Sequence, residues 1–267
     1  MTESSLRIAL CLKATPDPDD VAALALARQL RPDGSGLGLR LGHVPIGVHG
    51  FDAQALGFVA AIRRAHPRCQ TLAISVDPSD PETLFRSAFE LGIDEGWFLD
   101  SGGAASTHAD VAELLADAVR EFDASLVVLG DASSDDGNGV IGGMLAALLE
   151  RPCVAAVANV DVRETSVHAT RRRADGGGEV VSAPLPAIVT VRSDELDPPR
   201  PKAQEVLAAR DRQHVSKPVA PRRSSEPRLE RLNLAVDGVR GRCEMVEGVP
   251  ATKVATVLLD LIEGDAS

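Results

Sequence analysis

The sequence contains no tyrosine, and aromatic residues make up only 3% of it. Proteins that bind single-stranded nucleic acid stack bases on aromatic side chains, and few residues here could serve that purpose. The formal net charge is −11 at pH 7, so no overall positive field would attract a phosphate backbone. Both features argue against a nucleic-acid partner.

Cysteine is also scarce, and no two cysteines form a CxxC pair, so neither a zinc site nor a disulfide framework is indicated. We expect the four to be reduced and mostly packed: Cys11, Cys69, Cys153 and Cys243. No run approaches the roughly 18 apolar residues of a membrane helix, so membrane insertion is not expected. The short apolar run between Arg7 and Lys13 predicts a first strand, not a signal peptide, and hence a cytoplasmic protein.

Catalytic signatures are missing as well. No GxSxG, HExxH, GxxxxGK[ST] or GxGxxG pattern follows an apolar run. The histidines are scattered and predicted to be surface residues: His43, His49, His66, His108, His168 and His214. Asp135 and Asp136 could act in acid–base chemistry, although adjacent loop carboxylates more often serve as turn and capping residues. The composition favours a binding protein over a hydrolase.

Short apolar runs alternate with helical patterns along the chain, which is typical of a doubly wound, mostly parallel α/β sheet. The runs are apolar throughout and predict strands buried on both faces: Ile8–Leu12, Thr71–Val76, Gly96–Leu99, Leu126–Leu129 and Ala187–Val191. Helices are predicted between them at Phe51–Ala65, Pro81–Gly92, Ser106–Phe122 and Val140–Leu149.

The second half of the chain changes character. Val160–Val181 predicts a hairpin with its turn at Gly176–Gly178. We expect residues 1–196 to form one α/β nucleotide-binding domain and residues 197–267 to form a Pro- and Arg-rich arm. The arm ends in a predicted amphipathic helix, Ala251–Ile262, and an extended arm with a lone helix suggests contact with a partner subunit.

The stretch LVVLGDASSDDGNGVIGGM, Leu126–Met144, predicts a strand, a loop of small and acidic residues, and a helix start. Gly130 falls at the carboxyl end of the strand, where open α/β sheets bind ligands. Gly137 and Gly139 allow a close backbone approach, and the helix near Val140 offers free amides. The loop suits a phosphate or pyrophosphate; an ordinary strand-to-helix loop with glycine turns is the alternative.

Five segments in order resemble the electron transfer flavoprotein beta subunit, covering roughly residues 6–210. The first three are RIALCLKATPDPDD at the N-terminus, HGFDAQAL, and LFRSAFELGIDEGWFL. The last two are LVVLGDASSDDGNGVIGGMLAALL, which aligns with the family's nucleotide loop without gaps, and LPAIVTV after the hairpin.

This resemblance implies a flavodoxin-like (adenine-nucleotide-hydrolase-like) fold and an arm that embraces an alpha subunit. The alpha subunit would hold most of a redox FAD, and this chain would hold AMP, or a second FAD in bifurcating members. Electrons would pass between a dehydrogenase and an acceptor, with this chain as an electron carrier and not an enzyme. The implied nucleotide-site residues are Cys11, His49, Gly50, Phe51, Asp52, Val76, Gly130, Asp131, Ala132, Ser133, Ser134, Asp135, Asp136, Gly137, Asn138, Gly139, Val140 and Ile141.

Several positions depart from the family pattern. Asp131, Ala132 and Ser133 replace a basic residue followed by Gln-Ala, and Asp131 would repel a nearby phosphate. Gly139, Val140 and Ile141 replace polar residues that resemble Asn-Gln-Thr, so amide and hydroxyl donors are lost.

Two further positions concern partners. Ala203 takes the place of the family's apolar docking anchor within the segment Ala203–Arg210, which puts the usual dehydrogenase contact in doubt. Phe51 falls where the family has an aromatic beside the flavin, and a hydrophobic staple for the following helix is its other reading.

Three hypotheses follow. The first is an electron-carrier subunit of an FAD-containing heterodimer, and we adopt it. The second is a redox-inactive adenine-nucleotide-binding module of the same fold, suggested by the altered loop. The third, an independent enzyme using Asp135 and Asp136 on a phosphorylated substrate, lacks a nucleophile or metal-ligand cluster.

Overall fold

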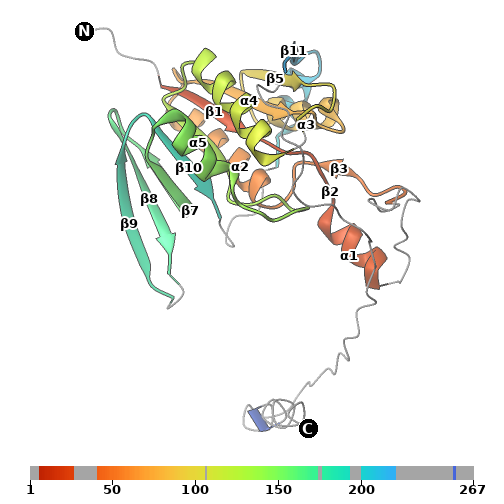
Figure 1. The fold of residues 1–267 in the computed structure, drawn as a ribbon, viewed down its shortest axis with the longest axis horizontal. Helices are drawn as coiled ribbons and strands as arrows, with labels where there is room; N and C mark the ends of the chain where they lie inside the picture. Colours follow the sequence, from red (N-terminus) through yellow and green to blue (C-terminus); the bar gives the residue numbers. More distant parts are fainter. Residues whose placement is uncertain are drawn as a thin grey trace.

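The computed structural model describes residues 6–26, 41–105, 107–173, 176–192, 200–220 and 255–256. Its central feature is a nine-stranded sheet in the order β11-β5-β4-β1-β6-β10-β7-β8-β9, with helices on both faces (Figure 1). The predicted α/β class with a doubly wound, mostly parallel sheet is confirmed.

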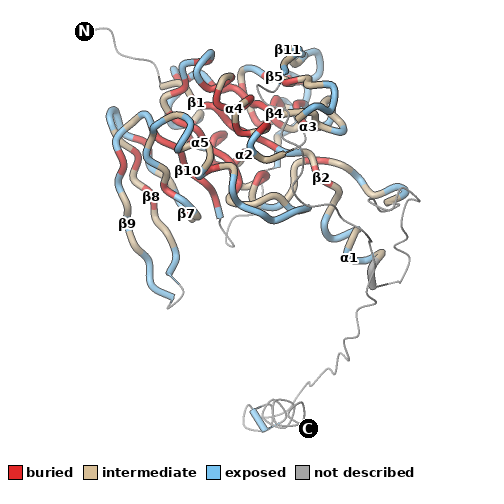
Figure 2. The backbone as a smooth tube through the Cα atoms, in the orientation of Figure 1, coloured by how far each residue is buried: buried red, intermediate tan, exposed pale blue. Residues whose placement is uncertain are grey.

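The parallel core contains the five predicted strands. They are β1 (Arg7–Cys11), β4 (Gln70–Val76), β5 (Glu95–Asp100), β6 (Leu126–Gly130) and β10 (Ala187–Val191). All five run parallel, with β1 between β4 and β6. Figure 2 shows that this part of the sheet is the most buried region of the molecule, as strands without polar alternation require.

Two helices cover each face of the parallel core. On one face, α2 (Gly50–Ala65) and α3 (Pro81–Glu90) pack with Ile8 and Leu10 of β1. On the other, α4 (His108–Glu121) and α5 (Ile141–Leu149) pack with Ala9 and Cys11. Successive β1 residues therefore serve opposite faces, as the strand period of two dictates.

Helix starts follow the predicted capping signals. The Asp80 carboxylate accepts a hydrogen bond from the Thr83 amide at 3.0 Å before α3, with Pro81 in its first turn. Thr107 and Asp110 form a reciprocal capping box at α4. The fourth predicted helix begins one residue later than expected, since Val140 is the N-cap of α5.

An antiparallel ribbon extends the sheet beyond β10. Its strands are β7 (Cys153–Val162), β8 (Ser166–Arg172) and β9 (Gly178–Pro184), and Figure 1 shows them projecting from the helical layers. The predicted hairpin is the β8–β9 pair. Its expected start at Val160 is wrong, because that residue lies within β7, which pairs with both β10 and β8.

The segment expected to begin an extended arm contains two elements that pack on the domain. Helix α6 (Ala203–Ala209) buries Ala209, and its Glu205 lies 3.5 Å from Arg64 of α2. Strand β11 (Val215–Pro218) extends the sheet beside β5, and the Lys217 ammonium lies 3.1 Å from the centroid of the Trp97 ring. The rest of the expected arm, including helix Ala251–Ile262 apart from residues 255–256, lies outside the described residues.

Three short elements precede α2 and were not expected. Strands β2 (Thr15–Pro16) and β3 (Ile46–Gly47) form a small antiparallel pair, and α1 (Pro18–Leu26) follows β2. Cys11 and Cys69 are buried free thiols and Cys153 is a half-buried one, whereas Cys243 lies outside the described residues. None of the described helices is long and apolar enough to cross a membrane.

Gly96 of β5 allows α3 to approach the sheet closely. A Cβ at Gly96 would lie 2.7 Å from Phe85 Cδ1 and 3.1 Å from Phe89 Cζ. We expect Gly96→Ala to lower the free energy of unfolding by about 1–3 kcal/mol through overpacking. Gly143→Ala is the control, since the new Cβ in the exposed helical position meets no atom within 4 Å and should raise stability by roughly 0.5–1 kcal/mol. Urea unfolding of both variants measures the difference, and equal stability of Gly96→Ala and wild type would contradict this packing.

Candidate functional site

A pocket of about 400 Å³ opens at the carboxyl ends of β1, β4 and β6. Open α/β sheets bind ligands at this edge, where the strand order changes direction. Its wall combines apolar residues with polar and charged ones, and residues of the loop Gly130–Gly142 supply much of it. The lining residues are Cys11, Leu12, Lys13, Asp52, Val76, Asp77, Ala105, Thr107, His108, Val111, Leu115, Leu129, Gly130, Asp131, Ala132, Ser133, Asp136, Asn138, Gly139, Val140, Ile141 and Gly142.

One buried carboxyl group hydrogen-bonds to two of the segments that line the pocket. Asp52, in the first turn of α2, accepts a hydrogen bond from the Gly130 amide through Oδ1 and another from the Lys13 amide through Oδ2, both at 3.0 Å. Burial raises the pKa of Asp52 to about 7, although the two backbone hydrogen bonds and the Lys13 charge oppose that shift. One side chain thereby fixes the ends of β1 and β6 relative to α2.

Position 130 must be glycine for Asp52 to accept these two hydrogen bonds. A Cβ there would lie 2.4 Å from Asp52 Oδ1 and 2.8 Å from the Asp52 amide nitrogen. The close backbone approach at this glycine is made by α2 of the same chain. The loop beyond it turns back at Gly137 and Gly139, both with φ of +63°.

The acidic side chains of the loop have polar partners from outside the loop. Lys13 Nζ lies 2.7 Å from Asp135 and 3.4 Å from Asp136, and His108 Nε2 lies 3.1 Å from Asp136. Burial raises the pKa of Asp136, but bonds from Ser133 and His108 with the Lys13 charge outweigh it and hold the pKa well below its usual range. The pKa of Asp135 is lowered for similar reasons. Two ionised, paired carboxylates are poor general acids, which weighs against the enzymatic hypothesis.

Asp131 is held away from the role expected for it. Its carboxylate accepts a 2.6 Å hydrogen bond from Thr190 Oγ1 and lies 3.7 Å from Arg192. The expected repulsion of a phosphate is thus partly offset by a guanidinium 56% exposed at the same edge. Neither Thr190 nor Arg192 was expected to take part.

The amino-terminal end of α5 borders the pocket. Val140 and Ile141 line it, and no described side chain caps the first turn. The unpaired amides and the helix dipole favour an anionic group at this point. Apolar contacts come from Val76, Val111 and Leu115, so the site suits a ligand with one flat apolar part and one anionic part.

The structure divides the predicted nucleotide-site residues into two groups. Those that line the pocket are Cys11, Asp52, Val76, Gly130, Asp131, Ala132, Ser133, Asp136, Asn138, Gly139, Val140 and Ile141. Those that do not are His49, Gly50, Phe51, Ser134, Asp135 and Gly137. Their function as ligand contacts stays a prediction.

Three residues at the start of α2, His49, Gly50 and Phe51, do not line the pocket. His49 is the N-cap, with Nδ1 3.8 Å from Asp17, and a Cβ on Gly50 would lie 2.5 Å from Ser134 Oγ. Phe51 lies inside the helix, so it is not the residue before the cap that a hydrophobic staple requires. Its ring lies 5.2 Å below the guanidinium carbon of Arg192.

Sequence reasoning missed the wall contributed by α4 and the loop before it. Ala105, Thr107 and His108 enter the pocket there, although the histidines were expected to be ordinary surface residues. The signal was the capping box: it marks a helix start directly after β5, whose carboxyl end must lie at the ligand-binding edge. Within the described residues, no group of three or more potential ligands could hold a metal ion.

A model of the electron transfer flavoprotein domain matches residues 42–220, which include most of this pocket. The chain belongs to the electron transfer flavoprotein family. It is similar to the electron transfer flavoprotein subunit beta of Dictyostelium discoideum, with 29% identity over 184 residues, 69% of this chain and 73% of that protein. It is also similar to the subunit beta of Bradyrhizobium diazoefficiens, with 26% identity over 192 residues, 72% of this chain and 76% of that one.

A third relative is the protein FixA of Azorhizobium caulinodans, with 26% identity over 200 residues, 70% of this chain and 66% of FixA. The predicted resemblance is therefore confirmed, and the chain is an electron transfer flavoprotein beta-type subunit.

The raised pKa of Asp52 predicts that the free energy of unfolding depends on pH. The carboxyl group is protonated in both states below about pH 4, and between about pH 4 and pH 7 only the folded state keeps the proton. The contribution of this group to the free energy of unfolding is therefore complete below pH 4 and falls by about 1.4 kcal/mol per pH unit up to about pH 7.

Asp52→Asn removes this titration while keeping one acceptor oxygen. Its unfolding free energy, measured in urea between pH 5.5 and pH 8, should lack the fall seen in wild type and should be lower by about 1–3 kcal/mol at low pH, where one amide loses its acceptor. If the unfolding free energies of the two proteins change equally with pH, Asp52 does not have the raised pKa on which this prediction depends.

Proposed function

We propose that this chain pairs with an FAD-binding alpha subunit as an electron carrier and holds AMP in the pocket beside β6. The observation that carries the proposal is a pocket at the carboxyl ends of β1, β4 and β6, lined by residues of the loop Gly130–Gly142 up to the start of α5, whose N-cap side chain makes no capping hydrogen bond. Free amides at a helix start can bind a phosphate without a catalytic group.

The pocket has features for both halves of a nucleotide. Val111 and Leu115 of α4 and Ile141 at the start of α5 offer an apolar lining for adenine. Amides near Gly139 to Ile141 would bind the phosphate, and the Lys13 ammonium lies on the same lining, where it pairs with Asp135 and Asp136. Backbone donors compensate in this proposal for the side-chain donors missing at Gly139, Val140 and Ile141.

The redox chemistry would come from FAD, which supplies electron transfer when it is bound, mainly by the alpha subunit. This chain would supply docking and electrostatics. Phe51 occupies the position where the family has an aromatic beside the flavin, and Arg192 lies over its ring. A guanidinium held at that edge would favour negative charge on a neighbouring group.

The proposal predicts the composition of the purified complex. Co-expression with an electron transfer flavoprotein alpha subunit should give a heterodimer that releases FAD and AMP in equal amounts on denaturation, measured by chromatography. Two FAD per heterodimer, or FAD without AMP, would contradict the assignment of AMP. Failure to form any flavin-containing complex would instead favour the redox-inactive nucleotide-binding module.

Filling the apolar wall should expel the nucleotide selectively. Val111→Trp places an indole in the pocket, and we expect the AMP content of the heterodimer to fall at least about tenfold while FAD is retained, because a few kcal/mol of steric cost suffices. Ala109→Trp is the matched control: it lies in the same turn of α4, is exposed and does not line the pocket. Equal AMP contents in the two variants would place the nucleotide elsewhere.

A further inference from the structure

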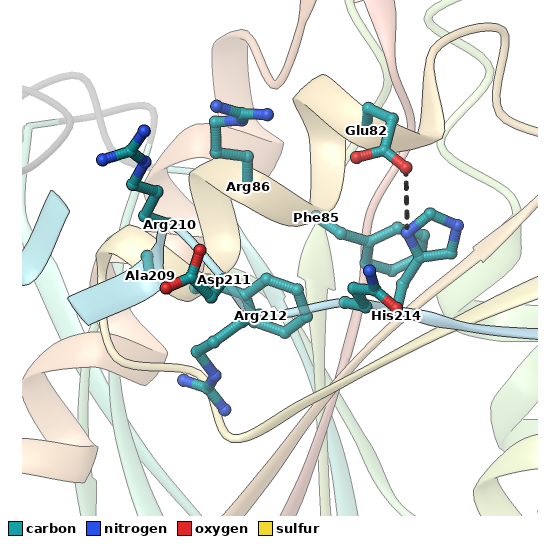
Figure 3. A pocket seen from close by; sticks show the side chains of 10 residues that line it. Glu82, Phe85, Arg86, Ala209, Arg210, Asp211, Arg212 and His214 are labelled. Carbon is teal, nitrogen blue, oxygen red and sulfur yellow. Dashed lines mark ion pairs between the residues drawn. The ribbon is translucent and has the colours of Figure 1, made fainter. Parts of the chain in front are cut away.

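A second pocket lies on the same face of the sheet as α3 and α6, away from the nucleotide site. It has a volume of about 280 Å³ and is bounded by α3, the end of α6 and the turn that leads into β11 (Figure 3). Its base is aromatic, formed by the buried rings of Phe85 and Phe89. None of its lining residues belongs to the nucleotide pocket.

Two basic groups are fixed over this base. The His214 ring stacks on Phe85 with centroids 4.9 Å apart, and its Nδ1 lies 3.9 Å from Glu82, the ion pair drawn in Figure 3. The Arg212 guanidinium carbon lies 4.7 Å from the Phe89 ring centroid, and this side chain also donates to the Asp94 carbonyl. The residues after α6 are thus held rigidly against α3 by ring contacts.

Two further arginines line the pocket without such restraint. Arg86 and Arg210 are exposed, and in the described part of the chain neither side chain makes a hydrogen bond or ion pair. Figure 3 shows both pointing away from the aromatic base. With Arg212, the lining contains three guanidinium groups and two carboxylates, those of Glu82 and Asp211, so the pocket is basic on a chain whose formal net charge is −11.

Apolar side chains are exposed on the adjoining helix. Leu207 is 70% exposed and Val206 39% exposed, and both belong to the same α6 that contributes Ala209 to the pocket. Exposed aliphatic groups beside unpaired arginines are the composition expected of a protein-binding surface, not of a small-anion site. Arginine forks bind carboxylates in a bidentate manner.

We propose that the α3–α6 pocket and Leu207 dock a segment of a redox partner protein that carries acidic and aliphatic side chains. The proposal rests on the electron-carrier function, and it replaces the contact weakened at Ala203 with a charged one at the opposite end of α6. A carboxylate of the partner segment enters between Arg86 and Arg210, and an aliphatic side chain covers Leu207. On an otherwise acidic protein, this basic surface also orients an acidic partner during encounter.

The test uses the heterodimer with its alpha subunit and two labelled synthetic peptides. One contains Leu-Glu-Glu-Leu and the other Leu-Gln-Gln-Leu, and fluorescence anisotropy measures binding at low and at physiological salt. We expect saturable binding of the glutamate peptide, weakened by salt, and at least about tenfold weaker binding of the glutamine peptide.

Variants locate the contact. Arg86→Gln combined with Arg210→Gln should weaken binding of the glutamate peptide at least about tenfold, because both carboxylate partners are lost. Arg163→Gln removes one charge from the distant turn after β7 and should leave it unchanged. Equal binding of the two peptides, no saturable binding, or an unaffected double variant would overturn the proposal. The FAD and AMP contents of the same preparations report separately on the electron-carrier proposal.

Discussion

The candidate nucleotide site depends on one contact, the hydrogen-bonded carboxyl group of Asp52. It joins three segments distant in sequence: the end of β1 through the Lys13 amide, the end of β6 through the Gly130 amide, and α2, on which it lies. A buried carboxylate is costly, as its raised pKa shows, and two amide donors make the cost tolerable. The same arrangement requires glycine at position 130 and so determines how the loop leaves the sheet.

Electrostatics explain how an acidic loop can line a pocket that we propose to bind an anion. Lys13 and His108 pair with the aspartates of the loop, and Thr190 and Arg192 hold Asp131. The side chains are occupied with one another, which leaves backbone amides and the start of α5 for a ligand. This division accounts for a sequence that contains little catalytic chemistry and yet builds a defined pocket.

Local signals in the sequence predicted much of the fold. Apolar runs identified the parallel strands, and the capping residues Asp80 and Thr107 identified helix starts, because these features depend on neighbours in the chain. The first part of β7 was missed because small residues and the positive φ of Ala156 conceal its alternation. Strand β11 has four residues and owes its place to pairing with β5, which no local pattern reveals.

The site was predictable where backbone shape decides and unpredictable where distant side chains meet. Gly130 was identified from its place at the carboxyl end of a strand and Gly139 from turn chemistry, and both line the pocket. His108 and Arg192 reach the loop across 28 and 61 positions of sequence, counted to Asp136 and Asp131, so the charge balance followed only from the fold. The resemblance to the flavoprotein family pointed to the loop Gly130–Ile141 but could not show which of its residues line the pocket.

Photoaffinity labelling of the heterodimer with 8-azido-AMP tests the central claim most directly. The account predicts that covalent label, located by mass spectrometry, appears in this chain on peptides containing residues 105–115 or 129–142 and disappears with excess AMP. Labelling confined to the alpha subunit, or labelling of this chain that AMP does not displace, would contradict it.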